Sequence, residues 1–214
     1  MMKNYGIPVA SEGWPFIIPL TIATVALYAF GWKNTACVSL ALTLFVLFFF
    51  RDPERAVPQG KGLVISPADG KVIVIKDIYE PDYLKQNVKQ ISIFLSVFNV
   101  HVNRAPCGGK VELVKYNPGK FHVASVDKAS LDNEQTAMVL FDGRNRILVK
   151  QIAGLIARRI VCYARPNDTL SAGERYGLIR FGSRVDIFLP KDAELKVQLG
   201  DRIKGARDVI AVLK

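Results

Sequence analysis

The chain has 214 residues, a formal net charge of +10 and a hydrophobic content of 50%. This length is enough for one domain with a core of its own and a small appendage. The three cysteines, Cys37, Cys107 and Cys162, are an odd number without metal-ligand spacing. The sequence therefore predicts no disulfide framework and no zinc site, and a reducing compartment fits. Nucleic acid is not expected as a partner, because the sequence has no RNA-binding signature.

Charge is distributed unevenly along the chain. Residues 1–50 contain only Lys3, Glu12 and Lys33 as charged side chains, whereas the other 164 positions carry 27 basic and 18 acidic residues. The part that follows residue 50 is therefore basic. A basic domain behind an apolar segment suits an anionic lipid surface, to which each well-placed cation adds about 1 kcal/mol.

Residues 14–32 and 34–50 form two apolar runs of 19 and 17 residues. Both are near the lower limit for a helix that crosses a hydrocarbon core of about 30 Å. A signal peptide is disfavoured, because no small-residue cleavage site follows and the charged segment 51–55 comes directly after the second run. We expect a helical membrane hairpin, with Arg51 and Arg55 favouring the cytoplasmic side. The sequence leaves open whether the two helices span the bilayer or only dip into it. A buried helical hairpin of a soluble protein is the alternative.

Short strands and Gly or Pro turns follow a polar linker at residues 53–61. We expect strands at residues 63–65, 71–75, 90–95, 110–116, 135–141, 146–152, 177–181, 185–189, 195–199 and 209–213. Charged or polar loops are predicted at 79–89 and 121–133, and segment 154–162 fits either a helix or a strand. The fold class is therefore mainly β (α+β), with an antiparallel β-rich domain at 53–214 behind the apolar helical hairpin at 1–52.

The step from Gly182 to Ser183 lies between two predicted strands. Because glycine has no Cβ, the carbonyl carbon of Gly182 is open to attack by the neighbouring Ser183 hydroxyl. A Gly-Ser pair between strands is also typical of a simple bulge or turn. From these residues alone both interpretations stay open.

Three motifs, in order across nearly the whole chain, carry a resemblance to a known family. They are PADG at 67–70, FNVHVNRAP at 98–106 and GLIRFGSRVD at 177–186. The chain resembles the short, membrane-anchored form of phosphatidylserine decarboxylase. The resemblance implies a proenzyme that cuts itself between Gly182 and Ser183. The products would be a β chain, 1–182, and an α chain, 183–214, which stay together as a heterodimer; further oligomerisation is left open.

The same resemblance implies that Ser183 becomes a covalent pyruvoyl (pyruvate) group, so that no metal or diffusible cofactor is needed. The amine of phosphatidylserine would form a Schiff base with this group, and loss of carbon dioxide would give phosphatidylethanolamine. His101 is expected to be the base, with Asp69 as its carboxylate partner. His122, in a polar loop, is interpreted as structural.

One position departs from the family pattern. Longer members have two histidines three residues apart, whereas here Arg104 follows His101 in the second position. We therefore expect His101 to serve both self-cleavage and decarboxylation, with Arg104 orienting a phosphate or carboxylate. Asn103 and Phe98 are further candidates for substrate binding.

Other functions fit the sequence less well. A related enzyme acting on another serine lipid, such as the archaeal ether analogue archaetidylserine, is one alternative, and a membrane-tethered β-barrel binding module with an intact Gly182–Ser183 bond is another. A serine hydrolase is disfavoured because the G-x-S-x-G elbow is missing. The expected location is the cell membrane, with phosphatidylserine and membrane lipid as partners and the catalytic domain on the cytoplasmic face.

Overall fold

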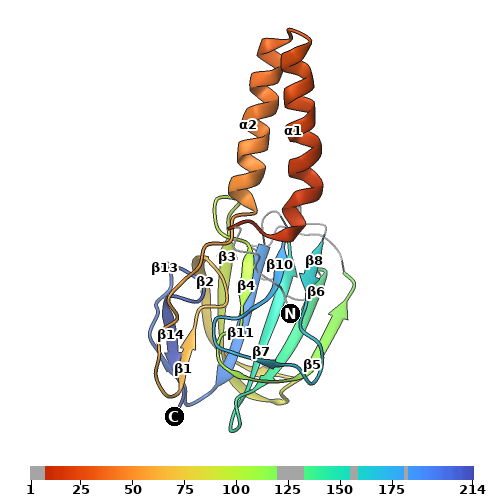
Figure 1. Cartoon of the computed structure of the whole chain (residues 1–214). Coiled ribbons are helices and arrows are strands. Elements are labelled where there is room, and N and C mark those ends of the chain that lie inside the picture. Colours follow the sequence, from red (N-terminus) through yellow and green to blue (C-terminus); the bar gives the residue numbers. More distant parts are fainter. Residues whose placement is uncertain (1–7, 120–132, 155–158, 181–182) are drawn as a thin grey trace. The chain divides into compact units, whose positions relative to one another are not determined.

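The computed structural model describes residues 8–119, 133–154, 159–180 and 183–214. These residues belong to two compact units, a helical unit that ends at Glu54 and a β-rich unit that begins at Arg55. Figure 1 shows the elements of both units. The expected class, an antiparallel β-rich domain with an N-terminal pair of helices, is confirmed.

The helical unit is a hairpin of α1 (Trp14–Ala29), which a 3-10 turn precedes, and α2 (Lys33–Phe49) (Figure 1). Gly31, with φ of 80°, provides the left-handed residue at the connection. The hydroxyls of Thr24 on α1 and Ser39 on α2 lie 2.8 Å apart, so the helices share a polar contact between apolar faces. The helical stretch Ser11–Ala29 is apolar and long enough to cross a membrane, whereas α2 is shorter. This composition is consistent with membrane association.

The β-rich unit contains three antiparallel sheets among the described residues. The largest has the strand order β13-β2-β3-β11-β7-β6-β5-β9. Its strands are β2 (Gly70–Glu80), β3 (Gln86–Leu95), β5 (Gly109–Asn117), β6 (Gln135–Phe141), β7 (Arg146–Ala153), β9 (Thr169–Leu170), β11 (Ser183–Pro190) and β13 (Arg202–Ile203). A second sheet joins β4 (Val102–Arg104), β10 (Arg175–Ile179) and β8 (Ile160–Cys162), and a third joins β1 (Leu63–Ile65), β14 (Val209–Val212) and β12 (Glu194–Leu195).

Strand β11 lies in the middle of the largest sheet, between β3 and β7 (Figure 1). Its side chains alternate between two buried faces. Val185, Ile187 and Leu189 pack in the main hydrophobic core, whereas Arg184 and Asp186 point to the opposite face and are also buried. A strand covered on both faces in this way is fixed in register, because a slip by one residue would exchange the two sets.

Several predicted boundaries were wrong. Residues 79–89 are mostly strand: β2 runs to Glu80 and β3 starts at Gln86, with Ile78 opposite Val88. The charged residues that suggested a loop, such as Glu80 and Lys85, lie between Ile78 and Val88 in the sequence. The strand expected at 195–199 is reduced to β12 at Glu194–Leu195. Within 154–162 the open choice is resolved for Ile160–Cys162, which form β8.

Candidate active site around Ser183

Ser183 is the first residue of β11 and is fully buried. It lies opposite Leu95 at the end of β3 and opposite Ala153 at the end of β7. Its hydroxyl is buried and has no hydrogen-bond partner among the described residues. A buried hydroxyl without a partner is costly for a fold, and such groups mark catalytic or strained positions. Gly182, the other half of the predicted cleavage site, lies outside the described residues.

The face of the sheet that carries the Ser183 side chain is covered by the smaller sheet of β4, β10 and β8. Val185, two residues beyond Ser183 and therefore on the same face, pairs with Gln151 of β7. The amide nitrogen of Gln151 donates to Asn103 Oδ1 on β4 at 2.8 Å. Asn103, a predicted substrate-binding residue, is thus a fully buried link between the two sheets.

His101 immediately precedes β4 and is fully buried. Its backbone oxygen accepts a hydrogen bond from the N–H of Ile179, the last residue of β10 and four residues before Ser183. Its ring Nδ1 lies 3.0 Å from the carbonyl oxygen of Asn99. A carbonyl only accepts, so Nδ1 carries the proton and, in the neutral ring, Nε2 has the lone pair that a base needs.

Asp69 ends the turn before β2, and two groups hold its carboxylate. Arg55 donates to both oxygens, with 2.9 Å from Nη2 to Oδ2, and the backbone N–H of Gly205 donates to Oδ1 at 2.8 Å. The side chains of Arg55 and Asp69 are only 10% and 9% exposed. Arg55 was not predicted as part of the site, because nothing in its spacing indicates this pair. The expected pairing of Asp69 with His101 stays a prediction.

A cavity of about 520 Å³ lies where β2 begins and β3 ends, and we call it the Asp69 cavity. Its lining residues combine cations, aromatic rings and small polar groups: Asp69, Gly70, Lys71, Phe94, Ser96, Phe98, Asn99, Arg202, Ile203 and Lys204. The cavity adjoins the other candidates through two neighbours. Ser96 follows Leu95, the partner of Ser183, and the carbonyl of Asn99 holds the His101 ring.

The remaining predicted residues differ in exposure. Phe98 is 66% exposed and lines the Asp69 cavity, as a substrate contact would. Arg104 is 4% exposed and its guanidinium donates to the carbonyl oxygen of Gly173 at 3.3 Å. Both substrate assignments stay predictions, and His122 lies outside the described residues.

The opposite face of β11 carries a buried polar network directly beside Ser183. Arg184 donates through Nε to Asp186 Oδ1 at 2.6 Å and through Nη2 to Ser92 Oγ at 2.7 Å. Gln90 of β3 donates to both Asp186 Oδ2 and Ser92 Oγ at 3.1 Å. Arg184 is 1% and Asp186 is 0% exposed, so this ion pair is among the most deeply buried features of the unit.

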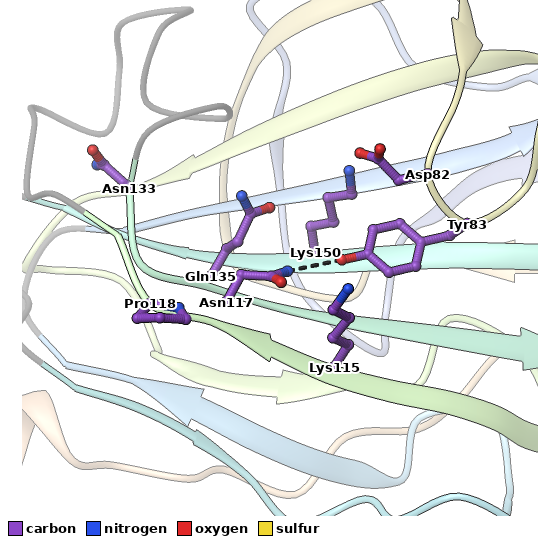
Figure 2. Close-up of a pocket in the computed structure, with 8 residues that line it drawn as sticks. All are labelled: Asp82, Tyr83, Lys115, Asn117, Pro118, Asn133, Gln135 and Lys150. Carbon is purple, nitrogen blue, oxygen red and sulfur yellow. Dashed lines mark hydrogen bonds between the residues drawn. The ribbon is translucent and has the colours of Figure 1, made fainter.

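A second cavity, of about 410 Å³, is lined by polar side chains from β5, β6, β7 and the turn after β2 (Figure 2). Asn117 donates to the hydroxyl of Tyr83 at 2.8 Å across it. The Lys150 ammonium, which also lines it, is paired with Glu80 at 3.2 Å. None of the predicted site residues is among its lining residues, so we do not assign it to the chemistry at Ser183.

The thiols of Cys107 and Cys162 lie in the β-rich unit. Burial raises the pKa of the Cys107 thiol to about 12 and that of Cys162 to about 11, so both are protonated at neutral pH. No cluster of His, Cys, Asp and Glu suited to a metal ion occurs in the part of the chain that the structure describes.

Comparison with known proteins shows to which family this chain is similar. A family model described as phosphatidylserine decarboxylase matches residues 42–211. The chain is 46% identical over 213 residues to the phosphatidylserine decarboxylase proenzyme of Geotalea uraniireducens, covering 99% of this chain and 100% of the relative. It is 49% identical to that of Syntrophotalea carbinolica and 45% identical to that of Ralstonia nicotianae, each over the full length of both chains.

These matches define the class of protein as a decarboxylase, which is a lyase. The chain belongs to the phosphatidylserine decarboxylase family. The family and the enzyme class predicted from the three motifs are thereby confirmed.

Proposed function

We propose that this chain cuts itself between Gly182 and Ser183 and then converts phosphatidylserine to phosphatidylethanolamine and carbon dioxide. The observation that carries the proposal is the buried Ser183 hydroxyl at the head of a central strand, without a hydrogen-bond partner among the described residues. Family membership supports it, as does the word proenzyme in the names of the relatives.

Self-cleavage starts at the Ser183 hydroxyl. His101 takes the hydroxyl proton through Nε2, since its Nδ1–H is directed to the Asn99 carbonyl. The Ser183 oxygen adds to the Gly182 carbonyl carbon, the carbon–nitrogen bond breaks, and the acyl group moves to oxygen as an ester. Elimination of this ester releases the carboxylate of Gly182 and leaves a dehydroalanine end, which takes up water and loses ammonia to give the pyruvoyl group at position 183.

The surroundings of Ser183 fit such a group. Residue 183 is held by its neighbours on both sides, Leu95 on β3 and Ala153 on β7, and its side chain lies on the covered face of the sheet. The pyruvoyl carbonyl supplies an electron sink for the electrons released with carbon dioxide, much as pyridoxal phosphate does. The buried position excludes bulk water, which would otherwise compete for the reactive carbonyl.

The side chains nearby would bind and protonate the substrate. His101 delivers a proton to the substrate carbon after carbon dioxide leaves, so the single histidine of this motif acts in both reactions. The carboxylate of Asp69, paired with Arg55, orients the polar head group or the His101 ring. Phe98 offers an exposed aromatic surface to the lipid. The position of Asn103 and Arg104 on β4, the strand that directly follows His101, supports a role for both in substrate binding.

The mature enzyme would consist of the chains 1–182 and 183–214, held together as a heterodimer. Residues 1–52 would form the membrane hairpin and residues 53–214 the catalytic domain on the cytoplasmic face, where Arg51 and Arg55 follow the second helix. Because phosphatidylserine has two acyl chains, an anchor in the bilayer keeps the enzyme beside its substrate.

Intact-mass analysis of the full-length protein in detergent tests this proposal. Wild type is expected to give two chains that meet at 182/183, with a pyruvoyl end on the smaller one, and to release carbon dioxide from phosphatidylserine. Ser183→Ala should remain one chain without activity, His101→Ala should lose processing, and the exposed-serine control Ser171→Ala should behave as wild type. An active wild-type enzyme that contains an unbroken chain would refute the proposal.

A further inference from the structure

We propose that the Asp69 cavity contains a phosphate-binding subsite formed by Lys71 and Arg202, with Lys204 beside them. This inference deepens the proposed function and rests on it, since it names the part of a serine phospholipid that these residues recognise. Its starting point is the sheet register, in which Arg202 of β13 lies directly opposite Lys71 of β2.

Two cations in directly opposite positions repel each other, and such pairs destabilise a sheet. Neither Lys71 nor Arg202 forms an ion pair with an acid in the part of the chain that the structure describes. No acid among the described residues therefore offsets this repulsion. An anion bound between the two side chains would offset it.

The charge balance of the cavity points in the same direction. Lys71, Arg202 and Lys204 all line it, and Asp69 is the acid among the lining residues. The negative charge of Asp69 is already paired with Arg55. The cavity is therefore positive, and a phosphodiester, with its oxygens spread over a tetrahedron, suits an arginine and a lysine that approach from neighbouring strands.

The position of the subsite suits a ligand that also reaches residue 183. Lys71 pairs with Phe94 on β3, and Phe94 pairs with Arg184, the neighbour of Ser183. Three neighbouring strands, β2, β3 and β11, thus span about 10 Å from the cation to the reacting residue. Lys71 and Ser183 point to opposite faces, and β3 ends at Leu95, the partner of Ser183, so the ligand that we propose would have to pass around this end of the sheet.

The Asp69 cavity also has aromatic side chains in its wall. Phe94 and Phe98 line it together with the cations, so it offers both an anion site and apolar surface. A glycerophospholipid presents this combination, with a phosphodiester next to hydrocarbon. Gly70 lets β2 approach β3 closely beside the cavity, because a Cβ at this position would lie 2.2 Å from the carbonyl oxygen of Phe94.

The test is kinetic and uses the full-length processed enzyme with dihexanoyl phosphatidylserine below its critical micelle concentration. Lys71→Gln and Arg202→Gln should each raise KM at least 10-fold, the size expected for a charged hydrogen bond, with processing unchanged. Inorganic phosphate should compete with this substrate in wild type and compete less in the variants. Lys71→Arg should retain the wild-type KM.

Lys76→Gln is the matched control, because Lys76 is an exposed lysine on the same strand that does not line the cavity. A second arm uses neutral phosphatidylcholine vesicles that contain phosphatidylserine, with and without added phosphatidylglycerol. If the variants lose activity only on the anionic vesicles, the cations attract the membrane surface and the subsite is refuted. An unchanged KM for the monomeric substrate also refutes it.

The subsite and the proposed function can fail separately. A wild-type enzyme without turnover of phosphatidylserine would overturn the function itself, whereas normal wild-type turnover with unaffected variants would overturn only the subsite. If Lys71→Gln is not processed, Arg202→Gln decides the question, since Arg202 is an exposed residue on the edge strand β13.

Discussion

The buried pair of Arg184 and Asp186 predicts a large and strongly non-additive effect on stability. Asp186→Leu removes the carboxylate partner of the Arg184 guanidinium at 1% exposure, and Arg184→Met removes the guanidinium partner of the Asp186 carboxylate at 0% exposure. Removing one partner of a buried ion pair costs about 3–5 kcal/mol, because the remaining charge has lost its compensation. The double variant leaves neither charge buried, and it should therefore cost much less than the sum of the two single changes.

The assay is urea unfolding of the full chain in detergent, in a Ser183→Ala background that keeps it a single polypeptide. Far-UV circular dichroism near 215 nm is the suitable probe, since Trp14 and Trp32 both lie in the helical unit and do not report on the sheet. In thermal unfolding the single variants should lose roughly 6–20 °C in Tm, at about 2–4 °C per kcal/mol for a domain of this size.

The exposed pair of Arg146 and Glu112 provides the control, because Arg146→Met removes an arginine–carboxylate contact at the surface and should leave the midpoint unchanged. The reasoning would be refuted by single variants that lose less than about 1 kcal/mol. It would equally be refuted by a double variant as unstable as the two single losses combined.

Three further predictions follow from contacts elsewhere in the β-rich unit. Burial raises the pKa of Glu80, but hydrogen bonds from the Leu84 and Tyr83 N–H groups and the charge of Lys150 outweigh this and lower it below 4.5. The stability that Glu80 contributes is thus present above pH 4.5 and lost as pH falls further, so the Tm advantage over Glu80→Gln should shrink from pH 6 to pH 3; a constant difference would contradict this. With a thiol pKa of about 12, Cys107 should resist iodoacetamide at pH 8 in the native protein and react after unfolding, which peptide mass spectrometry can follow; native labelling at the rate of a free thiol would count against it. Arg55→Met should slow self-cleavage about 10-fold, with Asp69→Asn similar and the double variant no worse, as gel densitometry can measure; additive losses would mean that the two residues act separately.

The parts of the fold that could be predicted are those in which apolar residues alternate without interruption. The strands at Gln135–Phe141 and Arg146–Ala153 were predicted almost to the residue, because their hydrophobic pattern and the turn between them agree. The hairpin of β2 and β3 was shortened in the prediction, since charged residues at its tip resemble a loop. In the structure Asp77 and Lys89 lie opposite each other on paired strands, so their charges support a hairpin.

The candidate site shows a similar division. Ser183, His101 and Asp69 were predicted from sequence motifs and their roles stay predictions, whereas the ion pair of Arg55 with Asp69 was missed because it depends on tertiary contacts. The Asn99 carbonyl that orients His101 is a backbone group, which no residue type reveals. The facing cations Lys71 and Arg202 are 131 positions apart, and only the sheet register brings them together.

The place of β11 has a consequence for the nature of the two products. The segment from Ser183 onward supplies the strand between β3 and β7, the strand beside β2 and the strand beside β1. Each of these strands is hydrogen-bonded to elements that precede residue 182, so neither fragment contains the whole of the largest sheet or of the sheet formed by β1, β14 and β12. A nicked chain would purify as one particle and come apart only in denaturant, and its pieces, made from separate genes, would have to meet before either could fold. The proposed cut would thus change the number of polypeptides but not the number of folding units.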